Sequence, residues 1–267
     1  TMRATVPGCV AMTNASVDVT VYAPGITVTA AAVGSGLVYH ANQVASLGAT
    51  GHGGVTVRIE SSDPSIALVS PNATTEGTPF IDVFVPDGSQ TVIFRTHGVE
   101  GMTGTATITA SATGFSNGTT TVDIVQPALQ ISGLLANTTS LAPDAPFYVQ
   151  VGVPNTPGTA LSAAQVFRPG GSALTATIES SLPTVGRLVT TAGASGSTTV
   201  EIAVGQSLSP TTVATGGVAF EPLTTGATTI TASIPGFIAT TNASYEVTVS
   251  TPGISVTSAT VGSGLVY

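Results

Sequence analysis

The three histidines are the first candidates for chemistry, because imidazole titrates near neutral pH and binds transition metals. His40 follows the segment GSGLVY, His52 lies in the glycine-rich stretch ATGHGG, and His97 precedes Gly98. None has a second histidine four residues away, a neighbouring pair of glutamates or the Asp-x-Ser context that nucleophilic catalysis would need. We expect solvated or hydrogen-bonded surface histidines, and we expect no enzyme activity.

Cysteine and lysine chemistry are constrained further. Cys9 is the one cysteine, so the chain can form no intrachain disulfide. It aligns with Phe115 and Phe237 in the repeats described below, which predicts a small buried hydrophobic residue in a strand. All five cationic residues are arginines. Because lysine is absent, a covalent Lys–Asn isopeptide cross-link is impossible.

The 13 acidic residues are the candidates for calcium, a cation that takes several carboxylate and carbonyl oxygens as ligands. The nearest pairs are Glu60 with Asp63 and Asp82 with Asp87. They are weak candidates, because the chain contains no D-x-D-x-D run. We therefore predict solvated carboxylates, no bound metal and no cofactor.

Sugars could be bound or covalently attached. Bound glycans usually stack on exposed aromatic side chains, and the chain has no tryptophan. Phe84, Phe94 and Phe220 occupy alternating strand positions, which predicts that they lie in the core. N-x-S/T sequons make N-glycosylation possible at Asn14, Asn72, Asn117, Asn137 and Asn242.

Composition excludes other classes of protein. The formal net charge is −8 and charged residues make up 7% of the chain, so no basic surface is available for nucleic acid. No apolar run reaches the ~18 residues of a transmembrane segment. Hydrophobic residues make up 42%, which is enough for a packed core.

Sequence periodicity predicts an all-β chain. The segments TATITAS, TTTVDIV and SYEVTVS alternate apolar residues with threonine, serine or charge, which is the pattern of a half-buried strand. Threonine is β-branched and favours strands, and the 31 glycines and 17 prolines supply turns. No segment has a convincing helical period. The longest irregular stretch, residues 153–172, is predicted to be a special loop.

The chain repeats itself over a long distance. Residues 23–39 read APGITVTAAAVGSGLVY and residues 251–267 read TPGISVTSATVGSGLVY, an offset of 251 − 23 = 228 residues. The match extends upstream, so that residues 1–39 correspond to residues 229–267. Such a pattern is typical of a segment taken from a longer array.

A weaker repeat lies inside the long one. VRIESSDPSIALVS (57–70) is similar to ATIESSLPTVGRLVT (176–190), and TATITASATGF (105–115) is similar to ATTITASIPGF (227–237). The glycine near the end of this second motif is found at positions 8, 114 and 236. The spacings between these glycines are 106 and 122 residues. These lengths suit one β-sandwich each.

The order of these motifs resembles the bacterial immunoglobulin-like (Big-type) domains that form tandem repeats in large secreted or cell-surface proteins. The family pattern is SS-(N/D)-P-S-x-A-x-V-S, a variable middle, G-T-A-T-I-T-A and a final V-x-V strand. The first unit carries it almost whole in residues 61–70, 104–110 and 121–125. The second unit carries it loosely, with Leu182 where the family prefers Asn or Asp. The resemblance implies tandem immunoglobulin-like β-sandwiches in a row.

The repeats and the resemblance together predict the domain organisation, with boundaries at Pro-containing linkers of one to three residues. Residues 1–23 would be the terminal strands of a preceding immunoglobulin-like unit, 24–126 one domain, 127–251 a second domain with its longer loop at 153–172, and 252–267 the first strand of a following unit.

The resemblance implies a structural role, namely a repeat segment of an extended stalk, adhesin or surface filament that is secreted, extracellular or at the cell surface. The implied partners are neighbouring repeats of the same protein, and lateral or strand-exchange self-assembly is a further option because the edges carry no lysine. An alternative stays open, a glycan- or protein-binding module acting through its loops. Its first candidates are residues 153–172 and the ATGHGG loop.

Overall fold

The structure is a computed structural model that describes residues 1–13, 15–18, 20–264 and 266. Its regular elements are β-strands, apart from two short 3-10 turns, Val213–Thr215 and Thr241–Ala243. The all-β class predicted from the period-two pattern is therefore confirmed. The described part of the chain forms no helix with the length and apolar character needed to cross a bilayer.

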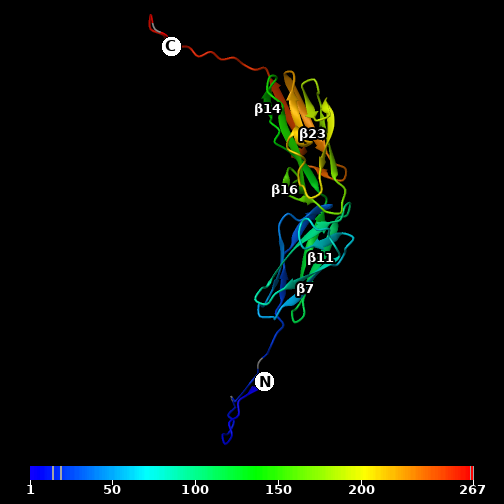
Figure 1. The fold of residues 1–267 in the computed structure, drawn as a ribbon, viewed down its shortest axis with the longest axis vertical. Helices are drawn as coiled ribbons and strands as arrows, with labels where there is room; N and C mark the ends of the chain where they lie inside the picture. Colours follow the sequence, from blue (N-terminus) through cyan, green and yellow to red (C-terminus); the bar gives the residue numbers. More distant parts are fainter. Residues whose placement is uncertain (14, 19, 265, 267) are drawn as a thin grey trace.

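Two β-sandwiches follow one another along the long axis of the molecule (Figure 1). We call them the first sandwich, built from β3 to β12, and the second sandwich, built from β13 to β25. The first contains β3 (Ile26–Val28), β4 (Ala31–Gly34), β5 (Leu37–Val38), β6 (Gln43–Leu47), β7 (Val55–Ser61), β8 (Ala67–Ser70), β9 (Phe80–Val85), β10 (Thr91–Gly98), β11 (Gly104–Ser111) and β12 (Gly118–Val125).

The second sandwich has the same plan with longer connections. It contains β13 (Ala128–Ser132), β14 (Asn137–Thr139), β15 (Ala145–Pro154), β16 (Leu161–Ala164), β17 (Val166–Phe167), β18 (Leu174–Ser180), β19 (Gly186–Thr190), β20 (Gly193–Ser195), β21 (Ser197–Ile202), β22 (Val218–Pro222), β23 (Gly226–Ser233), β24 (Ile238–Ala239) and β25 (Ser244–Ser250).

The two sandwiches share one strand order. One sheet of the first runs β4-β12-β11-β7-β9, and the matching sheet of the second runs β14-β25-β23-β18-β21. In both sheets the first pair is parallel and the others are antiparallel. The internal repeat of the sequence therefore corresponds to a repeated sheet topology.

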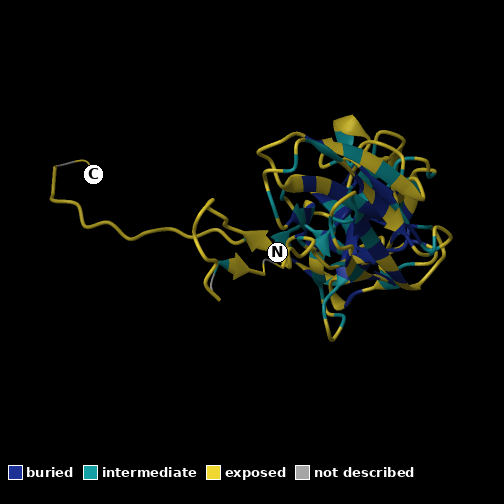
Figure 2. Cartoon of the chain, turned by 90° about the horizontal axis from the view of Figure 1, so that it is seen from below, coloured by how far each residue is buried: buried dark blue, intermediate teal, exposed yellow. Residues whose placement is uncertain are grey.

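Alternation along the strands gives each sandwich its own core. In β11 the side chains of Ala106, Ile108 and Ala110 are buried while the threonines between them face outward. The matching residues of β23, from Thr228 through Ile230 to Ala232, are buried in the same way. Figure 2 shows the result, with buried segments inside and exposed segments around them.

A serine holds the same place in both sandwiches. The hydroxyl of Ser62 accepts the N–H of Thr107 at 2.9 Å, and its own N–H donates to the carbonyl of Thr107 at 2.9 Å. Ser181 makes the same two bonds with Thr229, at 2.8 and 2.9 Å. The second serine of the SS motif thus joins two neighbouring strands, which gives the shared motif a structural reason.

The recurrence of the glycine in the second motif also has a structural reason. Gly8, Gly114 and Gly236 all adopt left-handed backbone angles, with φ of 82°, 84° and 83°. Each precedes a residue whose N–H closes the turn three residues back, at 3.1 to 3.2 Å. A side chain at these positions would strain the turn, so glycine recurs three times.

The N-terminal segment repeats a local pairing of the second sandwich. Strands β1 (Met2–Arg3) and β2 (Ser16–Val17) pair Met2 with Val17. Adding the sequence offset of 228 to both numbers gives Ile230 and Tyr245, which pair in β23 and β25. No second sheet covers the described part of this hairpin, because residues 1–13 are all exposed.

The prediction for Cys9 was therefore wrong, since Cys9 is exposed. Its counterparts Phe115 and Phe237 are half-buried because a complete sandwich surrounds them. The copy of β3 near the other end behaves similarly. Ile254 and Val256 are 97% and 90% exposed, whereas their counterparts in the first sandwich, Ile26 and Val28, are buried and half-buried.

Removal of one core side chain tests the two-core arrangement. We expect Ile108→Ala to destabilise the first sandwich by about 2–5 kcal/mol, because it removes a fully buried side chain and leaves a cavity. Ile230→Ala should do the same in the second sandwich. Chemical unfolding of the full chain, followed by hydrogen exchange in each core, measures both.

The control is Thr121→Ala on the exposed face of β12, which should change the unfolding free energy by less than about 0.5 kcal/mol. Equal loss of protection in both cores from either isoleucine substitution would contradict the presence of two separate cores.

Candidate functional site: the joint between the sandwiches

The predicted site residues are scattered. His40 is exposed, and His52 lies in its loop with Nε2 bonded to the carbonyl of Ser89 at 2.8 Å. The prediction of a surface histidine was wrong for His97, which is fully buried in β10. The loop after β8 covers it: a side chain on Gly77 would meet the His97 ring at 3.2 Å.

The weak calcium candidates do not converge. Within the described ranges, no three acidic, histidine or cysteine side chains come close enough to share a metal ion. Asp63 accepts the N–H of Ser65 at 3.0 Å, and Asp87 accepts the N–H of Gly53 at 2.8 Å, which lowers the pKa of Asp87. Glu60 is exposed on β7, and Asp82 is bound by Arg58, which lowers the pKa of Asp82.

The sequons lie on the surface where the structure describes them. Asn117, Asn137 and Asn242 are exposed, and Asn14 lies outside the described residues. Asn72 is exposed too, but its side-chain oxygen accepts the N–H groups of Thr74 and Thr75, each at 2.9 Å. A glycan on Asn72 would have to accommodate this turn, so Asn117, Asn137 and Asn242 are the more open sites.

Residues 153–172 are the segment that the structure brings to a distinct place. The sequence predicted an irregular loop, but the segment contains β16 and β17 and lies at the joint between the sandwiches. Strand β17 leaves its own sandwich and pairs with β5 of the first, with Val166 opposite Val38 and Phe167 opposite Leu37. Because Val38 also faces His97 in β10, one sheet continues across the joint.

Gln165 ties the segment to a second strand of the first sandwich. The side chain is 1% exposed and bridges the open edge of β4. Its Oε1 accepts the N–H of Gly34 and its Nε2 donates to the carbonyl of Ala32, both at 2.9 Å. The amide thus takes the place of a neighbouring strand, and its two bonds satisfy backbone groups of β4, of which the Gly34 N–H is buried.

An ion pair and an apolar insertion complete the contact. The guanidinium of Arg168 donates to both carboxylate oxygens of Glu100, with Nε to Oε1 at 2.8 Å. The Arg168 N–H also donates to the carbonyl of Gly36 at 3.0 Å. Leu37, from the first sandwich, is fully buried in the core of the second. The two sandwiches therefore share backbone pairing, charge and core at this joint.

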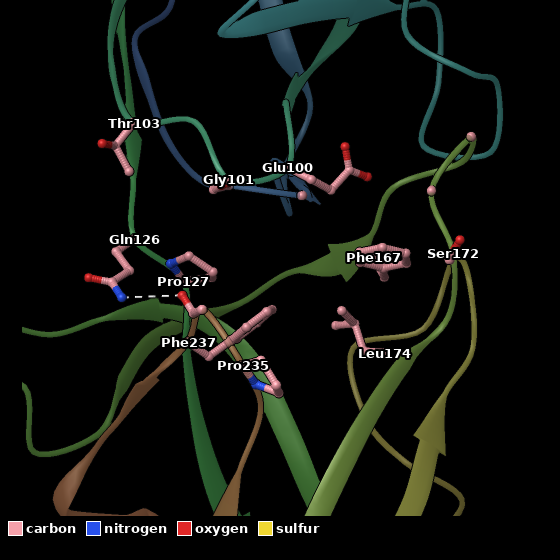
Figure 3. Close-up of a pocket in the computed structure, with 15 residues that line it drawn as sticks. Glu100, Gly101, Thr103, Gln126, Pro127, Phe167, Ser172, Leu174, Pro235 and Phe237 are labelled. Carbon is pink, nitrogen blue, oxygen red and sulfur yellow. Dashed lines mark hydrogen bonds between the residues drawn. The ribbon is translucent and has the colours of Figure 1, made fainter.

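The linker between the sandwiches is bonded on both sides. The carbonyl of Val125 accepts the N–H of Ser35, and the carbonyl of Pro127 accepts the N–H of Ile238 at 2.8 Å. The exposed Gln126 donates from Nε2 to the carbonyl of Gly236 at 3.2 Å (Figure 3). The connection at Gln126–Pro127 is consequently part of the structure on either side.

A cavity of about 800 Å³ lies in this joint (Figure 3). Its apolar lining includes Phe167, Leu174 and Phe237 from the second sandwich, and its polar rim includes Glu100 and Gln126 from the first. The volume is in the range of small-molecule sites. Yet its titratable member, Glu100, is already paired with Arg168, so the cavity holds no free acid–base pair for catalysis.

His97 lies one strand away from β17 and is held in its neutral form. Ser70 has one hydroxyl proton, which it donates to the carbonyl of Asn72 at 2.5 Å. His97 Nε2 is therefore assigned as the donor to Ser70 Oγ at 2.7 Å, and Nδ1 is buried without a partner. Burial first, and the nearby positive charge of Arg168 second, lower the pKa of His97 to about 4.

The sequence contained a partial signal for this joint. Residues 153–172 stood out only by length, and nothing in the spacing of Gln165 or Arg168 indicated partners in the preceding sandwich. The segment GSGLVY, which carries the acceptor strand β5, stood out by its repetition at residues 262–267. Pairing the two segments required knowledge of which loops meet at the joint.

The first prediction for the joint concerns Gln165. Gln165→Ala should leave the Gly34 N–H and the Ala32 carbonyl unpaired and weaken the joint by about 1–3 kcal/mol. Hydrogen exchange of the Gly34 amide in the full chain should then accelerate by roughly tenfold or more. The control Gln126→Ala removes an exposed bond of the same joint and should leave that rate almost unchanged. Equal rates in both variants would be inconsistent with a bridging role for Gln165.

The second prediction concerns pH. Because the pKa of His97 is lower in the folded chain than its ordinary 6.5, the unfolded chain binds the proton more readily. The stabilising contribution is complete above pH 6.5 and is lost as the pH falls towards 4, by roughly 3 kcal/mol in total.

Unfolding free energies at several pH values, compared between the chain and His97→Gln, isolate this term because the carboxylates titrate in both. The loss between pH 6.5 and 4 should be smaller in the variant. A parallel pair of curves would disprove the assignment of a neutral, buried ring.

Comparisons with known proteins give no family. No family matches the chain and no curated protein matches its sequence. Among solved structures it is similar to Yersinia pseudotuberculosis InvD (14% identity, 88% of this chain, 60% of that chain, TM-score 0.29), to the Yersinia pseudotuberculosis adhesin InvE (15%, 84%, 58%, 0.25) and to red sea bream transglutaminase (13%, 87%, 32%, 0.27). The chain spans less than two thirds of each, and at these TM-scores the similarity carries no argument about function.

Proposed function

We propose that the chain is a structural repeat segment of an extended extracellular stalk, adhesin or surface filament, in which two immunoglobulin-like sandwiches act as one stiff element. The interlocked joint is the observation that carries the proposal. Domains joined by a plain linker move relative to one another by default. Here the strand pair β17–β5, the Gln165 bridge and the Arg168–Glu100 pair all oppose bending, which is the property a stalk needs.

Repetition supports the same role. The 228-residue offset makes the pair of sandwiches the repeating element, with 24–126 and 127–251 as its two units and 1–23 and 252–267 as parts of its neighbours. Copies of one stiff element along a chain add length in proportion to their number. A protein with this plan would act as a spacer of defined length, a role that requires no catalytic centre.

The surface is suited to such a role. Outward positions of the long strands carry mainly threonine and serine, which bind water without net charge. Solubility therefore does not require the many charges that would make neighbouring copies repel one another. An extracellular location is part of the proposal, and the exposed sequons are compatible with it.

The alternative of a glycan- or protein-binding module has one feature in its favour, the cavity at the joint. The second sandwich contributes Phe167 and Phe237, rings on which a sugar or an apolar side chain could stack. We favour the mechanical role because Phe167 is buried and belongs to the strand that locks the joint.

The distance between two spin labels tests the proposal in the full chain. Labels on Thr121→Cys and Thr248→Cys, in a Cys9→Ser background, report on one exposed site in each sandwich. We expect a single narrow distance distribution from pulsed electron paramagnetic resonance. Unlocking the joint with Gln165→Ala and Arg168→Ala together should broaden it at least twofold, whereas Gln126→Ala should not. A distribution already broad in the unaltered chain would refute a stiff element.

A further inference from the structure

We propose that β9 is a docking edge for a second copy of this chain, formed by antiparallel pairing of β9 with β9 of a neighbouring molecule. The proposal rests on the structural role proposed above and names its lateral partner. It is carried by the position of β9 in its sheet, by its exposed aromatic residues and by the neutral charge of its outward row.

Strand β9 is an open edge. In the sheet β4-β12-β11-β7-β9 it is the terminal strand, and among the described residues its pairing is with β7 along Phe80–Val85. The sequence FIDVFV places Val85 in the core and turns Phe80 and Phe84 outward, 43% and 66% exposed. The prediction of a core position was thus wrong for Phe84, though right for Phe94 and Phe220. The two exposed rings lie on one face, roughly 13 Å apart along the strand.

The second sandwich supplies an internal comparison. Its matching edge strand is β21, with the sequence STTVEI. Phe80 lies opposite Glu60 of β7, and the matching position opposite Glu179 of β18 is Ser197. Phe84 likewise corresponds to Glu201. The fold therefore does not require aromatic residues at this edge, and their exposure in the first sandwich calls for a partner.

Charge on the edge is neutralised within the molecule. Asp82 is the charged residue of β9, and Arg58 binds both of its carboxylate oxygens at 2.8 and 2.9 Å. The Arg58 guanidinium also lies over the Phe80 ring, 4.1 Å from its centre. Natural edge strands commonly avoid pairing by presenting lysine or another unpaired charge. This edge presents a neutral ion pair between two aromatic rings instead.

The same edge on a second molecule is a suitable occupant. A twofold axis at Phe84 places Phe84 opposite Phe84 of the copy and Val83 opposite Val85, and it keeps the two Asp82 side chains out of direct opposition. Pro79 and Pro86 flank the strand and lack the N–H groups needed to continue the ladder. The pairing is therefore limited to a few residues. Such a contact is weak alone, but copies along two arrays that lie side by side and run in opposite directions add through effective concentration.

Sedimentation of the full chain over a concentration series up to about 1 mM tests the proposal. The unaltered chain should form dimers. The variant Phe80→Ser with Phe84→Glu carries the residues of the second sandwich, so it should fold, and its dimer dissociation constant should rise at least tenfold. The matched control Thr199→Glu, on β21, should leave the constant unchanged.

Hydrogen exchange identifies the contact. The amides of Asp82 and Phe84, which point away from β7 within this pairing, should gain protection with increasing concentration in the unaltered chain and not in the β9 variant. A chain that stays monomeric, dimers that persist in the β9 variant, or dimers lost in Thr199→Glu would each overturn the proposal. A monomer with a narrow Thr121–Thr248 distance would overturn this inference alone and leave the structural role standing. A dimer with a broad Thr121–Thr248 distance distribution would overturn the stiff structural role and leave the β9 pairing standing.

Discussion

Backbone pairing between β17 and β5 is the contact on which the arrangement of the two sandwiches depends. Val38 faces His97 on one side and Val166 on the other, so the sheet of the first sandwich continues into an insertion of the second. The pairing places Leu37 in the neighbouring core and Gln165 on the edge of β4. Because these groups are buried, bending the joint would expose apolar surface and unpair backbone groups together. Stiffness therefore comes from cooperation between these contacts, and the Arg168–Glu100 ion pair, which is partly exposed at Glu100, adds little by itself.

The two sandwiches differ at positions outside their cores, where side chains face a covering loop or the solvent. His97 of β10 in the first sandwich and Glu221 of β22 in the second occupy equivalent positions in the two matching sheets. His97 is buried, whereas Glu221 is paired with Arg187 near the surface. The loop containing Gly77 covers the histidine and raises the cost of its charged form, whereas Glu221 keeps its charge because Arg187 lowers its pKa. On the edge strands, the first sandwich has Phe84 in β9 where the second sandwich has Glu201 in β21. Surfaces have thus diverged around a common frame of serine bridges and glycine turns.

That common frame was predictable because it depends on local chemistry. A period-two alternation specifies a strand with one buried face, and Ile108 and Ile230 are buried as the pattern requires. The IESS and glycine motifs recur because a hydroxyl must join two strands and a turn must adopt positive φ. The same reasoning failed for Phe84, because alternation reports which residues share a face without saying which face is covered. It failed for Cys9 because a hairpin without a second sheet has no interior.

By itself the sequence determined the all-β class, the position of the repeats, the absence of an intrachain disulfide and of lysine chemistry, and most of each core. These follow from composition and short-range periodicity. Only the tertiary structure decided that residues 153–172 lock the joint, that His97 is buried and that β9 ends a sheet with its aromatic residues outward. Each of these depends on which loops and edges meet between elements far apart in the chain, and no local pattern encodes that.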